Sequence, residues 1–176
     1  MVERSWESER LLFAVMQEKD LASYHAVVGL EAVGKWLSTG KGKTREEAQE
    51  KIRLYRESFI NNSYGTWGVW EKNSGSFIGQ GGLMDFSLGG VELLYAFAPA
   101  YWGKGYATEC AKAVLAYGFS VCQLKRIVAV TLPQHQKSQQ VLLKAGFQEA
   151  GPVQLNGKTM TYFQRSRKQW QKNAIG

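Results

Sequence analysis

The hydrophobic positions recur with two different periods, and the change between them divides the chain into helical and strand-forming parts. After Thr44, apolar side chains follow one another in steps of three and four, as on one face of a helix. Thr44 and Glu47 have the spacing of a capping box, which predicts that this helix begins there. Residues 18–29 predict an earlier helix, and residues 10–15 predict a strand before it. The Gly- and Lys-rich residues 35–43 predict a loop between the helices.

Short aromatic and β-branched runs dominate the middle of the chain. Thr66–Glu71 and residues 77–83 flank the turn-forming residues 72–76, which predicts a β-hairpin. The Gly-rich turn that follows leads into Val91–Phe97, which predicts a third strand. Three antiparallel strands in succession are therefore expected.

The last part of the chain alternates between helix and strand. Apolar steps of three and four predict a helix over residues 108–119, and Gly146 is placed to end another over residues 136–145. Arg126–Thr131 predicts a buried strand, and the Asn156-Gly157 dipeptide predicts a hairpin turn before the last strand. This order predicts an α/β (α+β) fold, with a mixed, mostly antiparallel central sheet of about seven strands and helices on both faces.

Composition narrows the class of protein. The chain has 176 residues, 44% of them hydrophobic and 21% charged, which suits one globular domain over residues 1–176. No apolar run is long enough to span a bilayer, and the first residues lack the order of a signal peptide. We therefore expect a cytoplasmic protein, monomer or homodimer, with no membrane partner.

Cysteine usage and charge exclude further classes. Cys110 and Cys122 lie at opposite ends of one predicted helix, about 18 Å apart, so they cannot form a disulfide within it. No metal site is expected, because a Cys-rich cluster is missing. The net charge of +7 is compatible with simple solubility or with an anionic ligand. The basic residues are dispersed and those in 165–172 are expected in a solvated tail, so we do not expect a nucleic-acid partner.

Residues 98–109 form the most informative segment, because they join a predicted strand to a predicted helix. Gly103 and Gly105 fall at this junction, where free backbone N–H groups at the positive end of a helix bind phosphate oxygens. The pattern predicts a ligand with a pyrophosphate. A turn without a ligand is one alternative. A dinucleotide-binding loop is another, but it needs a parallel βαβ unit, and the preceding strands look like hairpins.

Four segments resemble, in order, the GNAT superfamily of acyl-CoA-dependent N-acyltransferases. Within that superfamily they are most similar to the ribosomal-protein N-terminal acetyltransferase (Rim-type) branch. The four segments are Ser8-Glu9-Arg10-Leu11-Leu12, Phe77-Ile78-Gly79-Gln80-Gly81-Gly82-Leu83, Tyr101-Trp102-Gly103-Lys104-Gly105-Tyr106-Ala107-Thr108-Glu109, and Ser138 with Val141-Leu142-Leu143-Lys144-Ala145-Gly146-Phe147.

The resemblance implies that acetyl-CoA (coenzyme A) is the cofactor and that the glycine junction holds its pyrophosphate. Lys104 can add a charge toward the phosphates, and Thr108 can donate a hydroxyl. Trp102 stands where the general loop pattern has Gln or Arg, which removes no backbone donor. The implied cofactor-binding residues are Phe97, Ala98, Trp102, Gly103, Lys104, Gly105, Tyr106, Ala107, Thr108 and His135.

The resemblance also implies two catalytic residues. Glu92 occupies the place of a general base that takes a proton from the substrate ammonium, and burial would raise its pKa toward that task. The backbone N–H of Phe97 would stabilise charge on the thioester oxygen. The Tyr that many members use as an acid is replaced by Leu142, whereas Ser138 occupies the place of a Rim-type Ser. The alternatives without a catalytic role are that Glu92 is a surface residue and that Ser138 only caps a helix.

Three further positions depart from the pattern or stand near the site. His135 replaces a usual Asn and could titrate near neutrality, unless it is only an exposed loop residue. Residues 151–155 lack the second carboxylate of some Rim-type enzymes, which favours Glu92 as the base. Trp36 lies beside a loop that covers the acceptor pocket in the family, whereas His25 is expected to be structural or a pocket wall.

The function implied is an acetyl-CoA-dependent N-acetyltransferase. A primary amine, either a protein N-terminus or a small-molecule amine, would attack the thioester directly in a ternary complex. Because the usual Tyr and Asn are missing, the alternative is a non-catalytic acyl-CoA-binding regulatory module. A nucleic-acid-binding protein would rest on net charge alone.

Overall fold

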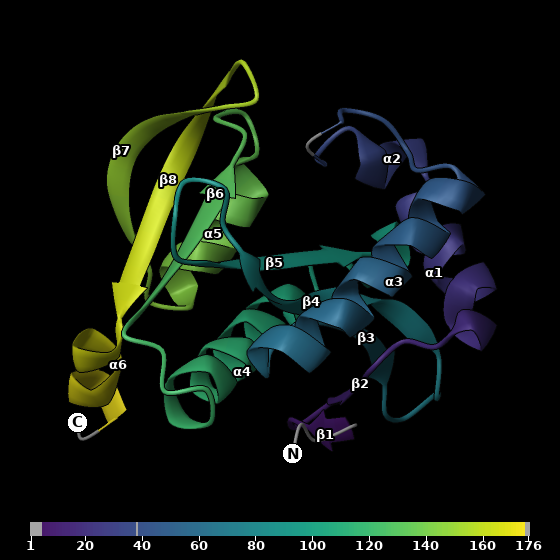
Figure 1. The fold of residues 1–176 in the computed structure, drawn as a ribbon, viewed down its shortest axis with the longest axis horizontal. Helices are drawn as coiled ribbons and strands as arrows, with labels where there is room; N and C mark the ends of the chain where they lie inside the picture. The colour runs from purple at the N-terminus through teal and green to yellow at the C-terminus, as the bar shows by residue number, and fades with distance from the viewer. Residues whose placement is uncertain (1–4, 38, 175–176) are drawn as a thin grey trace.

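The fold is organised around one mixed β-sheet (Figure 1). The computed structural model describes residues 5–37 and 39–174. The eight strands lie in the order β1-β2-β3-β4-β5-β6-β8-β7, and all neighbouring pairs except β5–β6 are antiparallel. The strands are β1 (Ser5–Glu7), β2 (Leu11–Ala14), β3 (Thr66–Glu71), β4 (Phe77–Asp85), β5 (Val91–Phe97), β6 (Arg126–Thr131), β7 (Gln148–Leu155) and β8 (Lys158–Ser166).

Helices cover both faces of this sheet. One face carries α4 and α5, and the other carries α1 and α3 (Figure 1). The helices are η1 (Glu18–Asp20), α1 (Leu21–Val28), α2 (Glu31–Gly34), α3 (Arg45–Asn62), η2 (Pro99–Tyr101), α4 (Tyr106–Ser120), α5 (Gln136–Lys144) and α6 (Arg167–Ala174). Within the described ranges no helix is long and apolar enough to cross a membrane.

Alternation along the strands separates two hydrophobic cores. Trp67 is fully buried in the larger core, on the α4 side, whereas Trp70 packs against the smaller core formed by α1 and α3. Residues three apart on a strand point to opposite faces, which is why these two indoles are separated. The smaller core also contacts Met84, at the end of β4.

The predicted strands and helices are confirmed, with three additions. The short edge strand β1 raises the count from about seven to eight, and α2 and α6 were not predicted. The expectation of a solvated tail over residues 165–172 holds for Lys168 and Lys172, which are exposed, but is wrong for the segment as a whole. Arg165 is 7% exposed in β8 and donates to the carbonyl of Ala145, and Trp170 of α6 packs on Phe119 at 5.6 Å between ring centroids. Trp170 packs against the hydrophobic core, and this contact keeps α6 against the rest of the domain.

The glycine junction lies between two parallel strands. The unit β5–α4–β6 is a parallel crossover, although the strands before it are antiparallel hairpins. The hairpins therefore do not exclude a dinucleotide loop. The sequence does so in another way, because Thr108 stands where the third glycine or alanine of that fingerprint is required.

The divergence of β5 from β6 shapes the centre of the molecule. These strands pair at a single position, where Glu92 lies beside Val128. The ladder does not continue toward Phe97, so a gap opens between the two strands at their carboxyl ends (Figure 1). Parallel strands that separate in this way leave backbone groups without ladder partners, which makes the gap a place for a ligand.

The capping box at the start of α3 is confirmed. The hydroxyl of Thr44 accepts the N–H of Glu47 at 3.2 Å, and the Glu47 carboxylate accepts the N–H of Thr44 at 2.8 Å. Both bonds satisfy backbone donors that the helix itself cannot satisfy.

We therefore expect Thr44→Ala to lower the free energy of unfolding by about 1 kcal/mol. Thr44→Ser keeps the accepting hydroxyl and should be close to wild type. Urea denaturation followed by circular dichroism measures both, and equal losses for the two variants would contradict the capping role.

Candidate active site

Backbone alternation directs two N–H groups into the gap beside β5. The N–H of Ala98 donates to the carbonyl of Ile78 at 2.9 Å, which fixes the residues of β5 that bond to β4. In an antiparallel ladder the alternate residues point their N–H groups the other way. Those of Tyr95 and Phe97 therefore face the side where β6 has moved away.

Trp102 leaves Phe97 with one free backbone group. The indole N–H of Trp102 donates to the carbonyl of Phe97 at 2.7 Å, so this carbonyl is satisfied. Both backbone groups of Ala98 are also occupied, because its carbonyl accepts the N–H of Tyr101 at 2.9 Å. The Phe97 N–H is thus the donor at the end of β5 that can meet a ligand, and Ala98 could contribute only its side chain.

The N-terminus of α4 carries the second set of donors. Gly105 caps the helix with φ of 82°, and Gly103 has φ of 73°, conformations that favour glycine. The intrahelical ladder begins with the N–H of Glu109 donating to Gly105, which leaves the N–H groups of residues 106–108 for a ligand. Lys104 is exposed, with its ammonium 5.6 Å from the Tyr101 ring centroid. This arrangement fits a pyrophosphate.

An ion pair holds this loop against the N-terminal strands. The Glu109 carboxylate accepts the hydroxyl of Ser8 at 2.6 Å, and the backbone N–H and guanidinium of Arg10 at 2.7 Å each. Arg10 also donates to the carbonyl of Lys104 at 2.9 Å and lies over the ring of Tyr106. Burial raises the pKa of Glu109, but together these hydrogen bonds lower it by more, so the pKa lies below its usual range. Sequence reasoning missed this role, although both ends lie in family-like segments.

Glu92 lies on the face of the sheet that carries α1 and α3. It sits directly opposite Met84, whose side chain packs against those helices, and opposed residues share a face. Burial raises the pKa of Glu92 to about 7, and the charge of Lys51 opposes that rise. A carboxyl group with this pKa exchanges protons near neutrality, as a general base must.

Buried polar atoms extend from Glu92 across the same face. Burial raises the pKa of Tyr55 in α3, and the charge of Glu92 adds to that rise. Tyr55 also lies close to Tyr24 and Gln80. The carbonyl oxygen of the Gln80 side chain is buried and has no hydrogen-bond partner among the described residues, whereas the buried Tyr24 hydroxyl lies beside that of Tyr55. Unpaired buried polar atoms are costly, so they mark a place where a polar ligand can bind.

Ser138 lies on the opposite face, and sequence reasoning missed its partner. The hydroxyls of Tyr95 and Ser138 are 2.8 Å apart, and Tyr95 also donates to the Ser138 carbonyl at 3.2 Å. Tyr95 shares the α4 face with Gly81, where an added Cβ would lie 2.2 Å from Cys110 Sγ. Burial raises the pKa of Tyr95, so its hydroxyl stays protonated. No sequence pattern could link a strand residue to a helix 43 positions away.

His135 joins the loop before α5 to the segment after α2. Its ring stacks on Trp36 at 4.1 Å between centroids, with 7° between the planes. Burial, together with Lys35 and Lys137, lowers the pKa of His135 to about 4. The expectation of titration near neutrality is therefore wrong, because burial, reinforced by the two lysine charges, disfavours the protonated ring. A contact of His135 with the cofactor stays a prediction.

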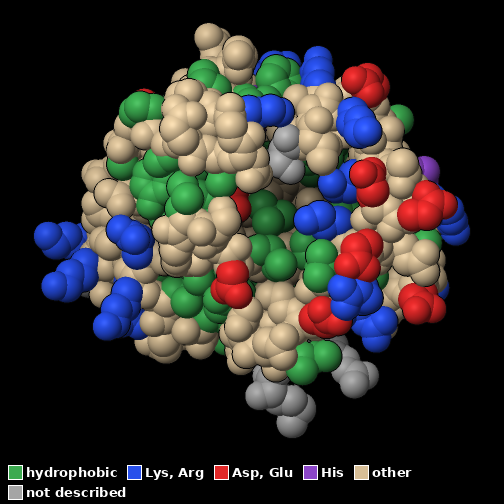
Figure 2. Space-filling model, turned by 45° about the horizontal axis from the view of Figure 1, so that its top comes forward, with side chains coloured by type: hydrophobic (Ala, Val, Ile, Leu, Met, Phe, Trp, Pro, Cys, Tyr) green, Lys and Arg blue, Asp and Glu red, His purple; other side chains and the backbone are tan. Residues whose placement is uncertain are grey.

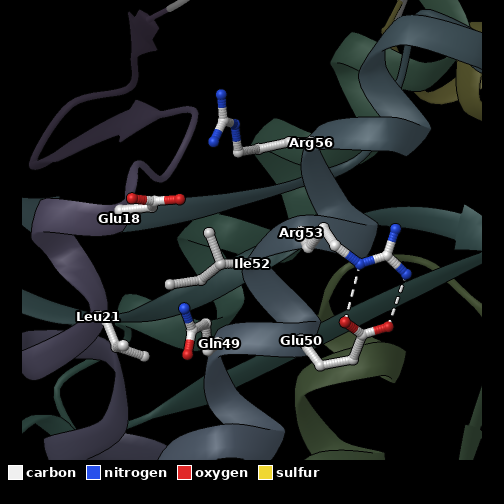
Figure 3. Close-up of a pocket in the computed structure, with 7 residues that line it drawn as sticks. All are labelled: Glu18, Leu21, Gln49, Glu50, Ile52, Arg53 and Arg56. Atoms are coloured by element: carbon white, nitrogen blue, oxygen red, sulfur yellow. Dashed lines mark hydrogen bonds and ion pairs between the residues drawn. The ribbon is translucent and has the colours of Figure 1, made fainter.

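A pocket on the outer side of α3 does not belong to this site. Figure 3 shows that it lies between α3 and the start of α1, lined by Glu18, Leu21, Gln49, Glu50, Ile52, Arg53 and Arg56. Arg53 is paired with Glu50 and Glu57 of its own helix. None of the predicted site residues lines it. In the described part of the chain, no three His, Cys, Asp or Glu side chains gather as a metal site.

The family is shown by a match along most of the chain. Residues 10–148 match the family model described as "Acetyltransferase (GNAT) domain", which includes Glu92, the α4 loop and Ser138. The chain therefore belongs to the GNAT acetyltransferase family. It is an N-acetyltransferase, and its cofactor is acetyl-CoA.

Individual relatives agree with this assignment. The chain is 26% identical over 147 residues to the "Uncharacterized N-acetyltransferase YoaA" of Bacillus subtilis (strain 168), covering 82% of this chain and 83% of the relative. Two solved structures share the fold. The ribosomal-protein-S5-alanine acetyltransferase from Vibrio fischeri matches with TM-score 0.75, 19% identity and coverage of 96% and 99%. The aminoglycoside acetyltransferase AAC(6')-Ib in complex with coenzyme A matches with TM-score 0.78, 18% identity and coverage of 93% and 99%.

We expect the bonds from Arg10 to Glu109 and Lys104 to act as a brace that strengthens coenzyme A binding by supporting the loop before α4. Arg10→Ala removes the guanidinium bonds to Glu109 and Lys104, so the loop loses its support. We expect the dissociation constant for coenzyme A, measured by calorimetry, to rise about five- to tenfold, since charge-assisted bonds at a half-exposed site are only partly screened.

Arg56→Ala, at an exposed position of α3, is the matched control and should bind coenzyme A like wild type. If Arg10→Ala also bound coenzyme A normally while keeping its melting temperature, the brace would have no role in cofactor binding.

Proposed function

We propose that the chain transfers an acetyl group from acetyl-CoA to a primary amine by direct attack in a ternary complex. The observation that carries this proposal is the half-buried Glu92, with its pKa near 7, at the point where β5 and β6 part. An ammonium has no lone pair, so the acceptor must lose a proton before it can attack. A carboxylate that ionises near neutral pH is suited to accept that proton.

The two faces of β5 have different tasks in this proposal. Glu92 holds the acceptor's proton on the α1–α3 face. The N–H of Phe97 points into the gap and stabilises charge on the acetyl carbonyl oxygen. The N–H groups at the start of α4 bind the pyrophosphate, with Lys104 and Thr108 as further contacts. Because the reactants meet in the gap, proximity supplies much of the rate.

Ser138 is the proton donor for the departing thiolate. Its hydroxyl lies on the α4–α5 face, hydrogen-bonded to Tyr95, whose raised pKa keeps it a donor. Tyr95 holds the Ser138 hydroxyl in place through this bond. This pair takes the place of the Tyr that many family members carry where this chain has Leu142.

The acceptor is an amine of the protein N-terminal or small-molecule kind. The motif resemblance favours the Rim-type branch, and the fold likeness to a ribosomal-protein alanine acetyltransferase supports it. An aminoglycoside acetyltransferase matches the fold equally well, so fold likeness alone does not choose between these acceptors.

Glu92→Gln tests the base. We expect kcat to fall by about 10²–10⁴-fold, since a general base contributes this much. The wild-type rate should rise as pH passes about 7, where Glu92 ionises, and the variant should lack that inflection. Release of the coenzyme A thiol across pH 5–9 with a panel of amines and N-terminal peptides measures both.

The same substitution has a control in stability. The folded pKa of Glu92 is raised, so its burial penalty grows as pH rises from about 4.5 through 7. Glu92→Gln should therefore unfold at higher temperature than wild type at pH 8, and show little gain at pH 4. Glu149→Gln, at an exposed position of β7, should change neither rate nor stability. Normal turnover by Glu92→Gln would contradict the base assignment, and coenzyme A binding without thiol release from any amine would favour a regulatory module.

Ser138→Ala and Tyr95→Phe test the proton donor together. Each should lower kcat by roughly ten- to a hundredfold, and the double variant should be little slower than either single one, because both act through one bond. Ser87→Ala, in the exposed turn after β4, is the control. Thiol-release kinetics would speak against the pair if the two losses multiplied or if neither variant was slower.

A further inference from the structure

Lys51 of α3 is the first residue on which this inference rests. It lies one helical turn before Tyr55, on the face of α3 that approaches Glu92, and it is half-buried. Tyr55 lies in the core that Met84 packs against, and Met84 is opposite Glu92 on the sheet, so Lys51 lies on the side of α3 toward Glu92, where its charge opposes the rise in the pKa of Glu92. Positions four apart on a helix share a face, so Lys51 and Tyr55 border this space together.

The second such residue is Lys43, just before α3. Its backbone is fixed to α1, because its N–H donates to the Val28 carbonyl at 2.9 Å and its carbonyl lies 3.1 Å from His25 Nε2. Its side chain is half-buried. Burial, followed by the charge of Lys51, lowers the pKa of Lys43, so the two ammonium groups are close enough to repel.

These two lysines lack ion-pair partners among the described residues. The ion pairs there involve Arg10, Arg53 and Lys72. Glu47 attracts Lys43, but its carboxylate is the acceptor of the capping box. Two half-buried like charges without paired carboxylates form a place where an anion is favoured.

Figure 2 shows a hollow in the surface, with hydrophobic side chains on its floor and both basic and acidic side chains along one rim. It lies between the side of the molecule that carries α2 and the side that carries the β7–β8 hairpin. The Trp36–His135 stack joins these two sides, and Lys35 lies 5.0 Å from the Trp36 ring centroid.

Buried polar atoms lie on the same face. The buried Tyr24 hydroxyl and Gln80 carbonyl oxygen lie near Tyr55, on the same face as Glu92. The face therefore offers acceptors for an ammonium group and ammonium groups for an anion, side by side. That complementarity matches a molecule that carries both charges.

We propose that the acceptor is a primary amine that also carries a carboxylate or similar oxyanion, with the oxyanion at Lys43 and Lys51 and the amine at Glu92. This inference rests on the proposed function, since it assigns the acceptor to the Glu92 face. It disfavours polyamines and aminoglycosides, whose further positive charges would meet these lysines.

The test compares amines that differ in one carboxylate. L-phenylalanine and 2-phenylethylamine are offered with acetyl-CoA to the full chain, and kcat/KM is expressed per neutral amine. We expect phenylalanine to be favoured at least about tenfold, as a charge-assisted contact allows. Lys51→Gln and Lys43→Gln should each reduce this ratio several-fold, and Lys168→Gln, exposed on α6, should leave it unchanged.

The ratio is the decisive readout for Lys51. Removing its charge also raises the pKa of Glu92, which slows both amines alike and cancels in the ratio. Tripeptide amides that begin with Asp or with Ala separate the two sources of the anion. A preference for the Asp peptide over phenylalanine assigns the oxyanion to an acidic protein N-terminus, and the reverse assigns it to a free amino acid.

Failure of this inference differs from failure of the proposed function. Transfer to amines with no carboxylate preference, with unchanged ratios in both lysine variants, or with spermidine as the best acceptor, overturns the inference alone. Calorimetry on the protein loaded with coenzyme A covers the other case. Binding of phenylalanine but not 2-phenylethylamine, without thiol release, keeps the oxyanion site and overturns the transfer reaction.

Discussion

β5 leaves its parallel neighbour after one pairing, at Glu92 and Val128, and the chemistry of the site depends on that separation. A continued ladder would consume the N–H of Phe97 and close the gap. Separation is tolerable because β4 still satisfies one edge of β5, and Trp102 satisfies the Phe97 carbonyl. What remains are the N–H groups of Tyr95 and Phe97, which face the gap from a strand whose other edge is bonded to β4.

The strand at this gap also sorts the chemistry between its faces. Glu92 and Tyr95 are three residues apart and therefore point in opposite directions. The first lies in a buried environment shaped by α1 and α3, which raises its pKa, and the second reaches Ser138 of α5. In the proposed mechanism, proton acceptance and proton donation are thus kept on separate sides of one strand.

Local signals in the sequence predicted the parts of the molecule whose causes are local. The capping box at Thr44, the strand alternation of Val91–Phe97 and the glycines at 103 and 105 act within a few residues of themselves. The environment of His135 depends instead on distant partners, and the stack with Trp36 in cationic surroundings reverses the expected titration.

Contacts between distant elements account for the rest. The brace from Arg10 to Glu109 spans 99 positions, and the bond from Tyr95 to Ser138 spans 43. The family-like segments include both ends of the first bond and Ser138 of the second, but a motif fixes residue types and leaves their contacts open. The packing of Trp170 on Phe119 was not predicted for the same reason.

The raised pKa of Glu92 is the central claim, and carbon-detected NMR titration of its side-chain carboxyl carbon measures it directly. Glu92→Gln assigns the signal. The account predicts a midpoint of about 7 in the folded protein. That midpoint should coincide with the inflection in the wild-type pH–rate profile. A midpoint near 4.5, the ordinary value for a glutamate, would contradict the account, because such a carboxylate would be solvated and not poised beside the gap.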